Sequence, residues 1–184
     1  MRKQSEALLD LHSMTEDVDW DSVYTAELPR IYNFFLYRVG NRELAQDLTA
    51  TTFERAWKHR SRYRPKIAAL STWLFGIARN VLKENLRKNR MNERKVVAIS
   101  RSEEMEADVD IEKYLQQEQE KEHLRVILLE LPEREQELIA LKYGAGLTNR
   151  EIAKITNLSE SNVGSILHRT VNTLRIRWED EYGR

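Results

Sequence analysis

The stretch LTNREIAKITNLSESNVGSILHRTVNTLR, residues 147–175, constrains the fold of this chain more than any other. Thr148 and Glu151 have the spacing of a capping box, in which a hydroxyl and a carboxylate satisfy free amides at the start of a helix. A turn follows at Asn157, and Ser159 is a good N-cap for another helix. The stretch therefore predicts two helices joined by a tight turn.

The second of these helices has two chemically different sides. Residues at helical spacing form an apolar side: Val163, Ile166, Leu167, Thr170 and Leu174. The opposite side is polar: Ser161, Asn162, Ser165, His168, Arg169 and Asn172. A short polar face on the second helix of a tight pair suits insertion into a DNA major groove. An ordinary helical hairpin with a solvated outer face is the alternative.

Composition indicates a helix-rich globular chain. The 184 residues, 41% hydrophobic and 33% charged, suffice for one average domain or two small ones. No run of about 18 uncharged apolar residues is present, and the polar N-terminus does not resemble a signal peptide, so we expect no membrane insertion. The absence of cysteine excludes disulfides and fits a cytoplasmic location.

A net charge of zero conceals two oppositely charged segments. Residues 55–95 contain 13 basic residues and two acidic ones, whereas residues 96–122 contain nine acidic residues and three basic ones. Such asymmetry indicates a polyanionic partner for the basic part of the chain. The acidic part, which lacks periodicity, is the predicted linker.

Three long helices are expected before the linker. The first, capped by Asp21 or Ser22, runs to about residue 39 and contains Pro29, which predicts either a kink or a helix that starts beside it. Its buried stripe is predicted to be Tyr24, Leu28, Ile31, Phe35 and Val39. The second spans about 42–59 after the cap Asn41, with Thr49 on its solvated side and Trp57 among its apolar residues. The third follows Ser71 as its cap, with Leu74, Ile77, Ala78, Val81 and Leu82 on its inner side.

The third helix carries cations in register, which we call the basic row: Arg79, Lys83, Arg87, Arg90 and Arg94. A solvated face usually mixes the signs of its charges, so a row of one sign favours contact with a phosphate backbone over a plain surface. Trp73 and Phe75 lie near its start and are expected either to stack on unpaired bases or to belong to the core.

Beyond the linker, helical periodicity returns over about 118–131, and Pro132 opens another helix with apolar residues up to Tyr143. The sequence thus predicts about seven helices and no convincing strand. The predicted fold class is all-α, with two small helical domains joined by an acidic linker.

Catalysis finds no support in the sequence. The four histidines are scattered without metal-binding spacing, and neither a phosphate-binding glycine loop nor a nucleophile elbow is present. We therefore expect no active site, no metal and no cofactor.

Two blocks of sequence together resemble the extracytoplasmic-function (ECF) group of bacterial RNA polymerase sigma factors. NRELAQDLTATTFERAWKHR, followed by STWLFGIARNVLKENLRKNR, is similar to the family's domain two. LPEREQELIALKYGAGLTNREIAKITNLSESNVGSILHRTVNTLR is similar to its domain four. The resemblance implies an N-terminal tail (1–19), a first domain (20–95), a linker (96–117) and a second domain (118–184).

The resemblance also implies roles for particular residues. The surface that grips the β′ clamp helices of core RNA polymerase would consist of Ala45, Gln46, Asp47, Leu48, Thr51, Thr52 and Phe53. The minus-ten element and the opened non-template strand would meet Arg64, Lys66, Ser71, Trp73, Arg79, Asn80, Lys83, Arg87 and Arg90. The minus-thirty-five element would meet Thr148, Arg150, Ser161, Asn162, Ser165, His168 and Arg169.

Further expectations follow from the family. The second domain would dock on the β flap and read duplex promoter DNA, and an anti-sigma factor would be a partner. Gly164 and Ile166 stand where family members often have cations, so the second domain alone should bind DNA weakly. A promoter-specificity subunit is thus the leading hypothesis. A stand-alone helix-turn-helix regulator and a helical adaptor without a DNA role are the alternatives.

Overall fold

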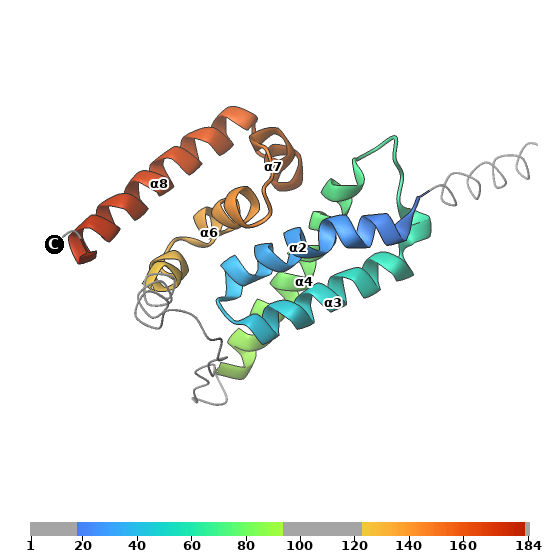
Figure 1. Cartoon of the computed structure of the whole chain (residues 1–184), viewed down its shortest axis with the longest axis horizontal. Helices are drawn as coiled ribbons and strands as arrows, with labels where there is room; N and C mark the ends of the chain where they lie inside the picture. Colours follow the sequence, from blue (N-terminus) through green and yellow to red (C-terminus); the bar gives the residue numbers. More distant parts are fainter. Residues whose placement is uncertain (1–17, 94–122, 183–184) are drawn as a thin grey trace, which may run out of the picture.

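Helices form all the regular structure in residues 18–93 and 123–182, the parts of the chain that the computed structural model describes. In chain order they are α2 (Trp20–Val39), α3 (Arg42–Lys58), the 3₁₀ turn η1 (Arg60–Arg62), α4 (Leu70–Glu93), a helix over 123–129, α6 (Glu133–Ile139), the π-helical turn η2 (Ala140–Gly144), α7 (Asn149–Thr156) and α8 (Glu160–Tyr182) (Figure 1). The all-α prediction is confirmed. The tail over 1–17 and the linker lie outside the described residues.

Helix α2 begins after Asp19, upstream of both predicted caps, because the Asp19 carboxylate accepts a hydrogen bond from the Ser22 amide at 3.1 Å. Pro29 lies inside this continuous helix, so a start beside the proline is wrong. Gly40 ends it with a φ of 65°, a left-handed conformation that glycine adopts without strain.

The buried side of α2 differs from the predicted stripe. Ile31 and Phe35 are fully buried as expected, but Phe34 is fully buried as well. Tyr24 was predicted to be buried and is 49% exposed. Phe34 meets Phe75 of α4 edge-on at 5.8 Å, whereas Tyr24 lies against Phe53 of α3 at the surface. The buried surface of α2 is therefore broader than one helical stripe near its C-terminal end.

Helix α3 begins at its predicted cap, since the Asn41 side chain accepts from the Leu44 amide at 2.8 Å. Thr49 was placed on the solvated side but is buried, and its hydroxyl donates to the Ala45 carbonyl at 2.6 Å. A hydroxyl satisfied within its own helix loses no hydrogen bond when it is buried. Trp57, predicted among the apolar residues, is 53% exposed.

Helix α4 starts at Leu70, so Ser71 lies within its first turn and is not its N-cap. The Trp73 amide already donates to the Ala69 carbonyl at 3.1 Å. The predicted inner side is largely confirmed: Leu74, Ala78, Val81 and Leu82 are buried, while Ile77 is half-buried.

The predicted helix-turn-helix is present. The Thr148 hydroxyl accepts from the Glu151 amide at 3.3 Å, and the Glu151 carboxylate accepts from the Thr148 amide at 2.8 Å. Asn157 turns the chain with a φ of 58°. Ser159 then caps α8, accepting from the Asn162 amide at 3.1 Å. Upstream, α6 continues directly into the π-helical turn η2, which the sequence did not predict.

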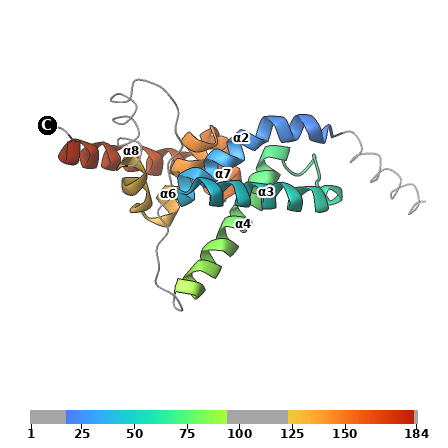
Figure 2. The same cartoon turned by 60° about the horizontal axis from the view of Figure 1, so that its bottom comes forward.

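The two domains pack against each other (Figures 1 and 2). Helix α2 contacts α6 and η2, and α4 contacts α7. Buried side chains of both domains belong to one continuous apolar cluster. A Cβ added to Gly144 of η2 would lie 3.0 Å from the Asn33 carbonyl oxygen of α2, so the two backbones approach closely. The sequence predicted two helical clusters but gave no indication of this contact.

Asn157 provides a test of the turn between α7 and α8. Because its φ is positive, we expect Asn157→Ala to lower the free energy of unfolding by about 1 kcal/mol, whereas Asn157→Gly should change it little. Denaturant unfolding of both variants measures the difference. Equal destabilisation by alanine and glycine would show that the lost side chain, not the backbone conformation, matters.

Candidate polymerase-binding and DNA-binding surfaces

The residues predicted to meet the minus-thirty-five element lie together at the surface of the second domain. All seven are exposed: Thr148, Arg150, Ser161, Asn162, Ser165, His168 and Arg169. The opposite side of α8 is anchored by Val163, which is fully buried, and by Ile166 and Leu167. The apolar contacts of α8 thus hold its polar side outward, as groove insertion requires.

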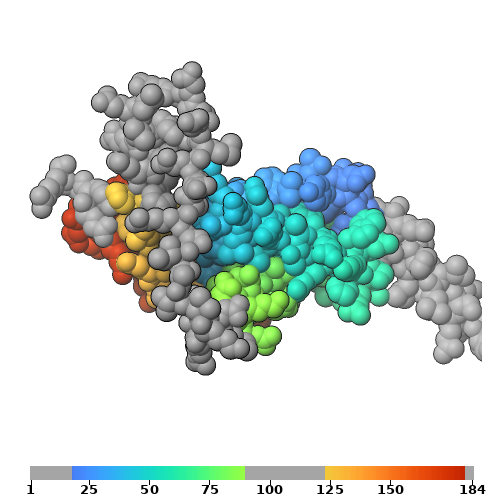
Figure 3. All heavy atoms as spheres, turned by 90° about the horizontal axis from the view of Figure 1, so that it is seen from below, coloured from blue at the N-terminus to red at the C-terminus, as the bar shows by residue number. Residues whose placement is uncertain are grey.

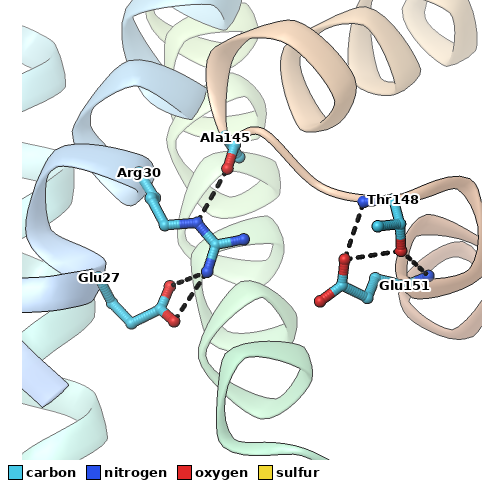
Figure 4. A network of polar contacts seen from close by, with 5 residues as sticks. All are labelled: Glu27, Arg30, Ala145, Thr148 and Glu151. Carbon is cyan, nitrogen blue, oxygen red and sulfur yellow. Dashed lines mark hydrogen bonds and ion pairs between the residues drawn. The ribbon is translucent and has the colours of Figure 1, made fainter.

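The capping box fixes the start of α7 beside this surface (Figure 4). The hydrogen bond from the Thr148 amide is the main cause that lowers the pKa of the Glu151 carboxyl, and the Thr148 hydroxyl contributes further. A carboxylate at the N-terminus of a helix also interacts favourably with the helix dipole. The Glu151 charge therefore stabilises the helix-turn-helix at neutral pH.

The predicted polymerase-binding face of α3 is only partly accessible. Ala45, Leu48 and Thr52 are buried in the core. Their contact with the polymerase stays a prediction. Gln46 and Asp47 are exposed. Thr51 and Phe53 are half-buried. Because apolar residues at helical spacing fit either a core or an interface, the sequence could not separate the two groups.

Exposed neighbours complete the accessible side of α3: Arg42, Glu43, Ala50 and Glu54. In the view from below, side chains of this helix and of the loop after it lie at the molecular surface (Figure 3). A partner that docks on α3 would thus meet mostly polar and charged side chains.

The loop after α3 contains two of the cations that are predicted to meet DNA, Arg64 and Lys66, and they differ in accessibility. Arg64 donates to the backbone carbonyls of Ser61 at 2.6 Å and Tyr63 at 2.9 Å, so its guanidinium is folded back on the loop. Lys66 is exposed, and its neighbour Ile67 is 82% exposed. Burial raises the pKa of the Tyr63 hydroxyl, which is consistent with a structural role for this ring.

Aromatic rings connect α2, α3, the loop and α4. Trp20 lies edge-on to Trp57 at 6.2 Å and to Trp73 at 6.3 Å, and Trp73 contacts Tyr63 at 5.5 Å. Trp73 is therefore a half-buried member of this chain of rings. Phe75 is fully buried, so it belongs to the core and the base-stacking alternative for it is wrong.

Trp57 is an exposed ring that the sequence did not indicate as a base-stacking residue. The Arg60 guanidinium lies over it, 4.1 Å from the ring centroid. Cation–π contact and exposure are typical of surfaces on which unpaired bases stack. The spacing of three residues between Trp57 and Arg60, beside a basic loop, was the available signal.

The basic row of α4 is not a continuous exposed surface. Arg79 forms an ion pair with Glu137 of the second domain, with Nε and Oε1 2.7 Å apart. Lys83 and Arg87 are exposed, as is Asn80 on the same helix. The side chains of Arg90 and Arg94 lie outside the described residues. Glu84 beside the row pairs with Arg55 of α3 at 2.7 Å.

Comparison with known proteins identifies the family. Sigma-70 region 2 matches residues 23–91, and Sigma-70 region 4 matches residues 121–174. The ECF RNA polymerase sigma factor SigM of Bacillus subtilis is 30% identical over 158 residues, which cover 84% of this chain and 92% of SigM. The chain belongs to the ECF RNA polymerase sigma factors. It is a promoter-recognising sigma subunit, so a stand-alone regulator is not favoured.

A further relative and two solved structures are similar to this chain in sequence or in fold. The ECF sigma factor RpoE of Cereibacter sphaeroides is 33% identical over 147 residues, covering 77% of this chain and 76% of RpoE. The sigma factor RpoE of Bartonella quintana, solved with the anti-sigma factor NepR, shares the fold with a TM-score of 0.63 at 20% identity, covering 85% of this chain and 94% of that one. CnrH, solved with the cytosolic domain of CnrY, gives a TM-score of 0.62 at 16% identity, covering 92% and 95%.

None of the helices in 18–93 and 123–182 is long and apolar enough to cross a bilayer. Within the same ranges, no group of three or more His, Asp or Glu side chains is arranged to hold a metal ion.

The shifted pKa of Glu151 predicts a pH dependence. Its folded-state pKa lies below the reference value of 4.5, so its stabilisation is present at neutral pH and is lost as the pH falls through the folded-state pKa. We expect Glu151→Gln to lower the free energy of unfolding by about 0.5 kcal/mol at pH 7, with the difference from the parent closing in acid. Thermal unfolding across pH measures this, with Glu179→Gln as the control for loss of an exposed charge on α8.

Proposed function

We propose that the sigma activity of this chain is divided among three surfaces. The exposed side of α3 binds the β′ clamp helices of core polymerase, the face of α4 with the preceding loop holds the opened minus-ten strand, and α8 reads the minus-thirty-five element. The observation that carries the proposal is the joint exposure of Asn80, Lys83 and Arg87 on α4, in the same domain as the partly exposed ring of Trp57.

Electrostatics and stacking give these surfaces complementary tasks. Cations on α4 neutralise backbone phosphates without reading sequence. An unpaired base stacks on an aromatic ring once the duplex opens, and each such stack contributes about 1–3 kcal/mol. Because the protein then binds the opened strand better than the duplex, strand opening needs no nucleotide hydrolysis.

On α8, polar side chains read bases but contribute little electrostatic attraction to the DNA backbone. Asn162 suits a bidentate contact with adenine, and Arg169 suits guanine or phosphate. Gly164 and Ile166 add no charge to this helix. The second domain therefore selects the site, and the first domain with the polymerase supplies most of the affinity.

We also propose that the chain works in the cytoplasm with core RNA polymerase and that an anti-sigma factor controls it. Support for the regulator comes from the sigma factor RpoE of Bartonella quintana, which has the same fold and was solved in complex with the anti-sigma factor NepR.

Run-off transcription with purified core polymerase on a promoter library tests the function as a whole. The proposal expects core binding and initiation at a defined class of promoters. A chain that neither binds core polymerase nor directs initiation would contradict it.

The α4 cations should matter for opening. We expect the double variant Lys83→Ala, Arg87→Ala to reduce transcription from duplex promoters about tenfold and from pre-melted promoters much less, since two phosphate contacts to the opened strand are lost. Run-off assays on matched duplex and bubble templates measure the ratio. The control is Asn162→Ala with Arg169→Ala, which should impair both templates because both need the minus-thirty-five element. Equal loss on both templates from the α4 variant would contradict the opening role.

Trp57 should act as a stacking platform. We expect Trp57→Ala to weaken binding of the holoenzyme to a minus-ten non-template oligonucleotide about tenfold, and Trp57→Phe to weaken it much less because a ring remains. Fluorescence anisotropy of a labelled oligonucleotide measures this, and thermal unfolding checks that the contact with Trp20 is not the cause. If phenylalanine and alanine behave alike, stacking is not the role of this residue.

A further inference from the structure

Four polar side chains follow one another along the outward side of α8, and we call them the polar row. They are Ser161, Ser165, His168 and Asn172, at spacings of four, three and four residues. Residues at these spacings share one face of a helix, and the row extends about 16 Å along the helix axis, the rise of about five base pairs. Helix α8 begins beside α7 and continues past it (Figure 1). The row is therefore long enough to follow several base pairs of a groove.

The composition of the polar row suits readout of bases better than attraction of phosphates. Ser161, Ser165 and His168 are exposed, and Asn172 is half-buried. None of the four is a lysine or an arginine, so the row adds no permanent positive charge. The two serines are short, which lets the start of α8 approach base edges closely. His168 and Asn172 are the two members that reach farther from the helix.

A hydrogen bond joins these two longer side chains. The Asn172 Nδ2 lies 3.2 Å from the His168 Nε2, across one turn of α8. An amide nitrogen only donates, so the imidazole Nε2 accepts and the ring proton lies on Nδ1. The bond therefore holds the amide plane of Asn172 in one orientation before any DNA is bound.

The groups that this bond leaves on Asn172 match one base. A primary amide has two N–H groups, so one N–H and the carbonyl oxygen remain for a partner when the other N–H is donated to His168. Adenine presents the complementary pair in the major groove, the N7 acceptor beside the N6 amino donor. Guanine presents two acceptors at the same place, which would leave the amide oxygen without a donor.

We infer that Asn172 reads an adenine of the minus-thirty-five element and that His168 is the positioning residue that orients its amide for this contact. The inference rests on the proposed role of α8 in minus-thirty-five recognition and adds a specificity-determining residue to it. Asn162 lies ten residues earlier on the helix, about 15 Å along its axis, so the two asparagines read different base pairs.

The pair of His168 and Asn172 has little structural work to do. A side-chain pair at this spacing on a helix surface stabilises the helix only slightly, so variants at both positions should fold. The next residue, Thr173, is exposed, and its hydroxyl donates to the Arg169 carbonyl at 3.1 Å within the same helix. Thr173→Ala is therefore the matched control, and thermal unfolding of every variant checks that α8 is intact.

The test measures base preference with the full chain bound to core polymerase. Holoenzyme binds promoters in which each position of the minus-thirty-five element carries each of the four base pairs in turn. We expect Asn172→Ala to reduce the preference for adenine at one position about tenfold, the effect of losing one bidentate contact, and to leave the other positions unchanged. Asn172→Asp should transfer the preference to cytosine, since a carboxylate only accepts and cytosine offers its N4 amino group. Thr173→Ala should change neither.

Substitutions of His168 test the positioning role. His168→Ala removes the acceptor that orients the amide, and we expect the adenine preference at the same position to fall several-fold. His168→Gln places another acceptor within reach of the Asn172 amide and should restore most of the preference. Equal loss with alanine and glutamine would show that His168 does not act through Asn172.

A base analogue separates base readout from phosphate contact. 7-Deazaadenine lacks the N7 acceptor but keeps its base pairing, so it should weaken binding of the parent several-fold and leave Asn172→Ala unaffected. An Asn172→Ala variant with unchanged base preference would overturn the inference. So would a uniform loss of affinity on all sequences, which indicates a phosphate contact. A parent holoenzyme without any minus-thirty-five preference, or without initiation, would instead count against the proposed function.

Discussion

Burial of α2 on more than one side is the constraint on which the rest of the structure depends. Ile31, Phe34 and Phe35 are each fully buried, and the helix contacts α3 and α4 of its own domain as well as α6 and η2 of the other. A helix with a single apolar stripe would hold only one domain together. Because α2 is shared, its packing both builds the first domain and positions the second beside it.

Local signals predicted most of the elements, and they failed where distant parts of the chain meet. The capping box of Thr148 and Glu151, the turn at Asn157 and the cap at Asn41 are confirmed because each depends on residues a few positions apart. The burial of Phe34 depends on packing with other elements of the fold, which no local pattern encodes. The π-helical turn η2 is likewise packed against α2, and propensities do not predict such a turn.

The candidate surfaces likewise include features that local sequence predicts and features that depend on the whole fold. The polar side of α8 was predicted correctly, since amphipathic periodicity determines which side of a helix faces outward. On α3, the motif that resembles the family's polymerase-binding block mixes core residues such as Leu48 with exposed ones such as Asp47. A binding motif contains both kinds of residue because its exposed side chains are held in place by buried ones beneath them. Only the structure shows which residues are buried and which are exposed.

The basic row shows why charge register alone could not establish an accessible surface. Five cations at helical spacing are expected to repel one another unless an anion compensates them, and the sequence offers no acid within the row. Glu137, 58 positions from Arg79 in the chain, provides that charge. The pair of Arg79 with Glu137 thus joins the two domains, whereas the pair of Arg55 with Glu84 lies within the first domain. The position of an acid in the chain therefore decides whether its ion pair stabilises one domain or joins the two.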